Sequence, residues 1–92
     1  MATTCVWDPV KAASNYRKHG VTFEEAATVL DDELVRIDAD LRHGEARQVA
    51  VGMSSRSRLI FVVSLELDGD VIRLISARRA TTSERRTYEE GE

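Results

Sequence analysis

The sequence predicts a single α+β domain in which an antiparallel β-sheet meander carries two packed N-terminal helices and a short C-terminal helix. Two observations predict this class. The first third of the chain holds two helix-start signals, at residues 8–9 and 22–25. From about residue 33 the apolar pattern changes to period two, and the connections are too short for the crossovers that parallel strands need. The 92 residues suffice for one domain, 1–92.

The two N-terminal helices have clear limits. The first begins after Asp8, whose side chain can cap it, continues through Pro9, and ends directly before Gly20, which can adopt a left-handed conformation. The second begins at the capping box of Thr22 and Glu25 and ends near residue 30. Its apolar residues recur at helical spacing and should face the core: Phe23, Ala26, Ala27 and Leu30. We expect the acids beside them to be exposed: Glu24, Glu25 and Asp31.

Four later segments have the pattern of strands: 34–38, 47–53, 58–67 and 71–77. The tripeptide at residues 68–70, Asp-Gly-Asp, predicts a tight hairpin turn between the last two segments. A short apolar stretch at residues 4–7 predicts a further edge strand. One of the residues at 81–83 should cap the last helix, because all three are Thr or Ser.

The charge is unevenly distributed. The net charge is −3, but the acids concentrate between residues 24 and 45. The cations gather in two clusters. The first-helix cluster consists of Lys11, Arg17, Lys18 and His19. The C-terminal cluster consists of Arg73, Arg78, Arg79, Arg85 and Arg86. Local positive charge of this kind favours a phosphate-rich partner despite the acidic total.

Several other classes of protein are disfavoured. No apolar run approaches the roughly 18 residues of a membrane span, and the first residues do not have the pattern of a signal peptide, so we expect a cytoplasmic protein. Cys5, the only cysteine, cannot form an intramolecular disulfide, and the chain has no zinc-ligand spacing. Asp40, His43 and Glu45 are spaced too loosely to favour a metal site. We therefore expect no metal and no cofactor.

One stripe of the first helix has residues suited to binding a phosphate. Lys11, Asn15 and Lys18 share a face, because they are four and three residues apart, and His19 lies next to them. A histidine side chain can also transfer protons near neutral pH. The alternatives are a solvated helix face and a His19 that satisfies the last helical carbonyls.

The arginines of the last strand stand at the rim of the predicted sheet. Alternation should place Arg73 and Arg79 on one face and Arg78 on the other. Arginine suits phosphate because its planar guanidinium can bind two oxygens at once. The alternative is that Arg78 or Arg79 pairs with a carboxylate such as Glu84, while the arginines of the last helix are solvated.

Two long motifs carry a family resemblance. The segments WDPVKAASNYRKHGVTFEEA (7–26) and ISARRATTSERRTYEEG (75–91), with GMSSRSRLIFVV (52–63) between them, resemble the BrnT family of toxins from type II toxin–antitoxin systems. The resemblance implies a RelE-like ribonuclease fold and growth arrest through RNA cleavage. It also implies a ribbon-helix-helix antitoxin that neutralises the toxin, in a heterotetramer that binds operator DNA through the antitoxin.

RNA can be cut without a metal when its 2′-hydroxyl attacks the adjacent phosphate. This reaction needs a base, an acid and cations that stabilise the charge on phosphorus. The expected catalytic residues are Lys18, His19, Arg78 and Glu84. The expected RNA-binding residues are Lys11, Asn15, Arg73, Arg79, Arg85 and Tyr88. The alternative function is a non-catalytic module that binds nucleic acid or a partner and acts only in an antitoxin–operator complex.

Overall fold

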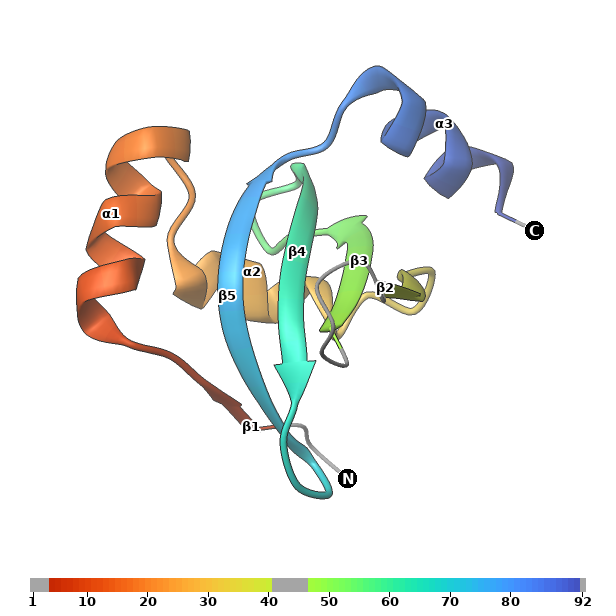
Figure 1. Ribbon diagram of the computed structural model, residues 1–92. Coiled ribbons are helices and arrows are strands. Elements are labelled where there is room, and N and C mark those ends of the chain that lie inside the picture. Colours follow the sequence, from red (N-terminus) through yellow and green to blue (C-terminus); the bar gives the residue numbers. More distant parts are fainter. Residues whose placement is uncertain (1–3, 41–46, 92) are drawn as a thin grey trace.

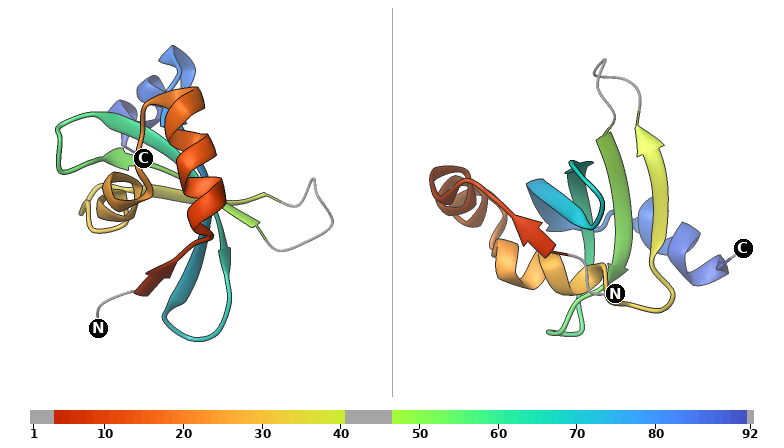
Figure 2. Two further views of the ribbon diagram at one scale, coloured as in Figure 1. Left: turned by 90° about the vertical axis from the view of Figure 1, so that its left-hand side faces the viewer. Right: turned by 90° about the horizontal axis from the view of Figure 1, so that it is seen from below.

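The computed structural model describes residues 4–40 and 47–91. The elements follow in the order β1 (Thr4–Val6), α1 (Pro9–His19), α2 (Phe23–Val29), β2 (Arg36–Asp40), β3 (Arg47–Met53), β4 (Leu59–Glu66), β5 (Val71–Arg79) and α3 (Thr82–Glu90). The helices α1 and α2 lie on one face of a five-stranded sheet, and α3 packs beside β3 on the other side (Figures 1 and 2). His43 and Glu45 of the weak metal alternative lie outside the described residues.

The sheet is mixed, with the strand order β1-β5-β4-β3-β2. The strands β2 to β5 pair antiparallel with their neighbours in chain order, as expected. The edge strand β1 instead pairs parallel with β5, from Thr4 opposite Val71 to Val6 opposite Arg73. The prediction of a purely antiparallel sheet is therefore wrong. Two helices and three strands separate β1 from β5 along the chain, and this length allows the strand to enter the sheet in the parallel direction.

A β-bulge at Ile75 changes which faces the side chains of β5 occupy. Val63 pairs with Ser76 and the next residue of β4 pairs with Leu74, so Ile75 has no partner of its own. Leu74 and Ala77 are consequently both buried although they are three residues apart.

The bulge also corrects the predicted positions of the arginines. Arg73 stands opposite Leu65 and Arg78 opposite Phe61, so these two arginines share the face of the sheet that points away from α1 and α2. Arg79 stands opposite the buried Ile60 and therefore points to the helix-covered face. Strict alternation instead predicted that Arg73 and Arg79 share one face of the sheet and that Arg78 lies on the other.

The predicted helix limits are confirmed. The Asp8 side chain accepts a hydrogen bond from the Val10 N–H, and Gly20 closes α1 with a φ of 69°. Thr22 caps α2 by accepting from the Glu25 N–H. Thr81 caps α3 in a reciprocal capping box with Glu84. Each of these signals lies within four residues of the helix end it fixes, which explains why the sequence was sufficient to place it.

The core lies between α2 and the sheet. Its α2 residues are Phe23, Ala26 and Val29, and its sheet residues are Ala50, Ile60, Val62, Leu74 and Ala77. Trp7 packs edge-on against Phe23, with the ring centroids 6.0 Å apart. None of the helices in the described part of the chain is both long and apolar enough to span a membrane.

Glu25 is buried, which contradicts the expectation that it would be exposed. Its carboxylate accepts hydrogen bonds from Arg58, which binds it through both Nε and Nη2, and from the Ser54 hydroxyl. Arg58 also donates from Nη2 to the Gly20 carbonyl, at 3.2 Å. The hydrogen bond from Arg58 holds the pKa of Glu25 below its ordinary value, against the opposing effect of burial. This ion pair joins the start of α2 to the β3–β4 turn.

Candidate active site

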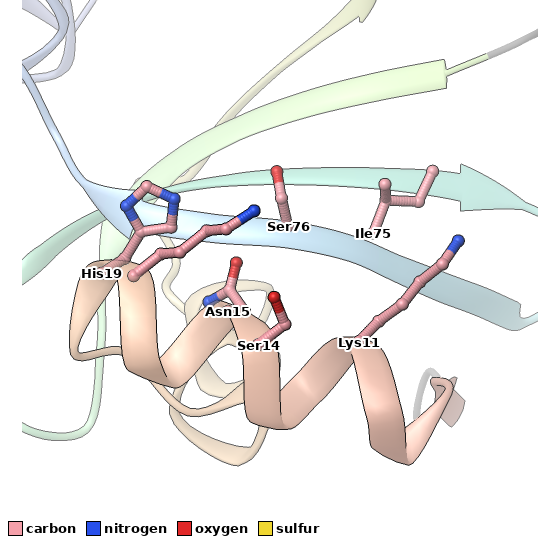
Figure 3. A pocket seen from close by; sticks show the side chains of 7 residues that line it. Lys11, Ser14, Asn15, His19, Ile75 and Ser76 are labelled. Atoms are coloured by element: carbon pink, nitrogen blue, oxygen red, sulfur yellow. The ribbon is translucent and has the colours of Figure 1, made fainter.

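Three residues of the first-helix cluster, Lys11, Lys18 and His19, border a groove between α1 and β5. The groove has a volume of about 200 Å³ and is lined by Lys11, Ser14, Asn15, Lys18, His19, Ile75 and Ser76. Figure 3 shows Lys11 and His19 at opposite ends of this stretch of α1, with Ile75 and Ser76 across from them on β5. None of the lining residues is acidic. The two lysines give this open groove a positive lining of the kind that attracts anions.

The lining residues Ser14, Ile75 and Ser76 were missed in the sequence. Ser14 could have been found, because it is three residues after Lys11 and four before Lys18, on the same helical stripe. Ile75 and Ser76 reach the groove at the bulge of β5, and the sequence shows no sign of this bulge.

Asn15 lies in the groove wall but its amide is already engaged within the chain. The side chain is almost fully buried and bonds to Ala77 and to the carbonyl of Val21. Since Nδ2 uses both of its hydrogen atoms in these bonds, we do not retain Asn15 as an RNA contact.

Arg78 is held by three interactions at the end of β5. Its Nη1 and Nη2 donate to the two carboxylate oxygens of Glu84, each at 2.9 Å, and Nη1 also donates to the Arg79 carbonyl. Its guanidinium lies 4.2 Å from the centre of the Phe61 ring. Pairing of Arg78 with Glu84 is one of the alternatives that the sequence left open. The side chain of Arg78 is still 36% exposed, so one side of it can meet solvent or a ligand.

Glu84 is an acceptor whose oxygens are already bonded. Besides Arg78, its Oε1 accepts from the Thr81 N–H. Burial raises the pKa of Glu84, but the hydrogen bonds from Arg78 and Thr81 outweigh it and leave that pKa below the ordinary value. A carboxylate whose pKa is lowered by such bonds is a weak proton acceptor. The structure therefore favours a role for Glu84 in orienting Arg78 over a role in proton transfer.

The other expected site residues lie outside the groove lining. Arg73 and Arg79 are exposed, on opposite faces of the sheet. On α3, Arg85 lies 3.7 Å from Glu89. The hydroxyl of Tyr88 donates to Asp32, which raises the pKa of the phenol to about 12.

Within the described residues, no three or more His, Cys, Asp or Glu side chains are grouped so that they could hold a metal ion.

Comparison with solved structures identifies the fold. The structure matches the crystal structure of the Brucella abortus ribonuclease toxin, BrnT, with a TM-score of 0.70 and 22% sequence identity, covering 88% of this chain and 100% of that chain. At this identity the match establishes the fold. None of the curated protein sequences matches the chain.

The family is established by a second comparison. The family model described as the ribonuclease toxin BrnT of type II toxin–antitoxin systems matches residues 7–84. The chain therefore belongs to the BrnT family of ribonuclease toxins, and the resemblance drawn from its motifs is confirmed. Membership of a type II toxin–antitoxin system implies an antitoxin partner.

Proposed function

We propose that the chain is an endoribonuclease that cuts RNA in the groove between α1 and β5, without a metal ion. The observation that carries this proposal is the convergence of Lys11, Lys18 and His19 on one groove free of lining acids. RNA phosphates are the anions that such a groove fits in a ribonuclease toxin family.

The proposed reaction is an internal transfer at phosphorus. The ribose O2′ attacks the adjacent phosphate and gives up its proton, the P–O5′ bond breaks, and the departing O5′ takes a proton. The products are a 2′,3′-cyclic phosphate and a 5′-hydroxyl. His19 is the proposed proton-transfer residue because it lines the groove and histidine is the side chain that most often serves as a general acid or base. Lys11 and Lys18 would stabilise the negative charge that builds on the phosphate oxygens.

The proposed role of Arg78 is to bind a phosphate at the edge of the groove, with Glu84 as the residue that orients it. Ser76 lines the groove two positions before Arg78 on the same strand and on the same face of the sheet. Arg73, which shares that face, and Arg79 at the rim are proposed contacts for flanking phosphates. We propose that Tyr88 holds α3 to the rest of the fold through its bond to Asp32. Arg85 would support the helix itself by pairing with Glu89.

The experiment compares three alanine variants of α1 on a mixed RNA. Loss of His19 should lower the cleavage rate by roughly 10²–10⁴-fold, as for a general acid–base group. Loss of Lys18 should lower it by about 10²–10³-fold, as for a group that stabilises transition-state charge. Arg17→Ala is the matched control, because Arg17 is on the same helix and does not line the groove. Equal cleavage by the Lys18, His19 and Arg17 variants would remove the groove from the mechanism.

We further propose that the antitoxin is a ribbon-helix-helix protein that covers this groove in a heterotetramer and binds operator DNA itself, in the cytoplasm. An acidic segment would match the cations of the groove. Covering the groove would exclude RNA both sterically and by charge.

A further inference from the structure

The edge of β5 that faces away from β4 is covered in two different ways. The strand β1 pairs with it only from Val71 to Arg73. Four residues further on, the Asn15 side chain takes the place of a strand. Its Nδ2 donates to the Ala77 carbonyl at 2.9 Å, and its Oδ1 accepts from the Ala77 N–H at 3.0 Å. An amide that exchanges both bonds with one backbone residue reproduces the hydrogen-bonded pair of an antiparallel ladder.

The same side chain also holds the end of the helix. The Asn15 Nδ2 donates to the Val21 carbonyl at 3.0 Å. Val21 follows directly after Gly20, the C-cap of α1 that comes next to His19. One amide therefore fixes both the middle of α1 and the turn that ends it.

Packing alone gives α1 little else to fix its position. Asn15 is the only buried residue of this helix. It lies four residues after Lys11 and three before Lys18, so the side chain that contacts β5 projects from the same stripe as the groove lysines. A shift of α1 relative to β5 would move Lys11 and Lys18 relative to Ser76 of the groove lining.

From these contacts we infer that Asn15 is a positioning residue, which sets the groove cations of α1 against β5 by acting as a one-residue strand. The inference rests on the proposed function, since it assigns Asn15 to the same groove. A displacement of about 1 Å at a reacting centre can reduce the rate of an enzyme roughly 100-fold. Asn15 would therefore act on the rate of cleavage without touching RNA.

The test compares Asn15→Ala and Asn15→Asp with Val29→Ala. The Asp variant retains the acceptor for the Ala77 N–H but loses both donors. Val29 is fully buried on α2 and does not line the groove, so its variant controls for lost stability. We expect both Asn15 variants to lower kcat about 100-fold with a smaller change in KM, and the Val29 variant to retain the wild-type kcat at a temperature where each variant is folded.

Hydrogen exchange of the Ala77 amide supplies a readout that does not depend on activity. In the wild-type protein it should be protected like the interior of the sheet, and a rapidly exchanging Ala77 amide would overturn the inference even if neither Asn15 variant folds. A folded Asn15 variant that cleaves RNA as fast as Val29→Ala would overturn it too. Absence of cleavage by the wild-type protein would instead contradict the proposed function. The exchange rate of the Ala77 amide would then show separately whether Asn15 holds this edge.

Discussion

Arg78 and Glu84 form a two-pronged ion pair that ties the end of β5 to the first turn of α3, with both N–O distances at 2.9 Å. Glu84 also closes the capping box with Thr81. The pair leaves the Arg78 side chain partly exposed, so a phosphate can approach a guanidinium whose orientation is already set.

This relationship predicts that Glu84 is not needed for proton transfer. Glu84→Gln retains an acceptor for the capping box but loses the charge that faces Arg78. We expect it to lower the free energy of unfolding by about 1 kcal/mol, as for a partly exposed ion pair, and to change the cleavage rate less than about tenfold. Urea denaturation and a single-turnover RNA assay measure the two effects. A loss in the rate of the size that general acid–base groups produce, roughly 10²–10⁴-fold, would return Glu84 to a direct catalytic role.

The buried pair of Glu25 and Arg58 predicts an acid-sensitive fold. Because the pKa of Glu25 is lowered in the folded state, its ionised form contributes stability that is present above the unfolded-state pKa, about 4.3, and is lost as the pH falls through the folded-state pKa. Glu25→Gln should lower the free energy of unfolding at pH 7 by about 3 kcal/mol, since it leaves Arg58 without its charged partner. Denaturation curves recorded from neutral to acid pH should show that the free energy of unfolding falls less steeply with pH in this variant than in the wild type. An unchanged slope would mean that Glu25 does not carry the acid sensitivity.

Tyr88 gives the corresponding prediction at high pH. Its hydroxyl donates to Asp32 at 2.6 Å, and the pKa of the phenol is raised from 10.0 to about 12. The neutral phenol thus contributes stability that is present below about pH 10 and is lost as the pH rises towards the folded-state pKa. Phenolate formation is followed by ultraviolet absorbance as the pH is raised. The difference between the wild type and Tyr88→Phe should show a phenol that ionises with a pKa of about 12. A difference curve centred near the ordinary tyrosine pKa would show that α3 is not held by this bond in solution.

If the antitoxin covers the groove as proposed, RNA cleavage and antitoxin binding should use the same surface. Replacing Lys11 and Lys18 together with alanine should weaken antitoxin binding as well as RNA cleavage, with the larger effect on binding at low salt. Arg17→Ala serves again as the control on α1. Calorimetric titration with the purified antitoxin at two salt concentrations makes the comparison. If the double variant lost cleavage and bound the antitoxin with unchanged affinity at low salt, the two surfaces would be separate.

The sequence predicted the local features of this fold and missed those made by residues far apart in the chain. The caps at Asp8, Gly20 and Thr22 follow from residues within a turn of each helix end. The bond of Asn15 to Ala77 joins residues 62 positions apart, and that of Glu25 to Arg58 joins residues 33 apart. No periodicity in the sequence indicates such partners, so a buried polar side chain was interpreted as an exposed one in both cases.

The sequence likewise predicted one wall of the candidate site, on α1, and missed the other, on β5. The helical stripe places Lys11 and Lys18 together, because helical spacing is regular. The prediction for β5 failed after Ile75, where the bulge reverses the face of each later residue. A one-residue irregularity of this kind depends on the pairing with β4. It decides that Arg78, and not Arg79, shares a face of the sheet with Ser76 of the groove lining.

The most direct test of metal-free cleavage in the groove is the chemistry of the new RNA ends. The purified protein is incubated with RNA in excess EDTA, with His19→Ala as the control for contaminating nucleases, and the product termini are identified by mass spectrometry. Attack by the ribose O2′ predicts 2′,3′-cyclic phosphate and 5′-hydroxyl ends that the His19 variant forms roughly 10²–10⁴-fold more slowly. Cleavage that EDTA abolishes and a divalent ion restores, or products with 3′-hydroxyl and 5′-phosphate ends, would contradict the account.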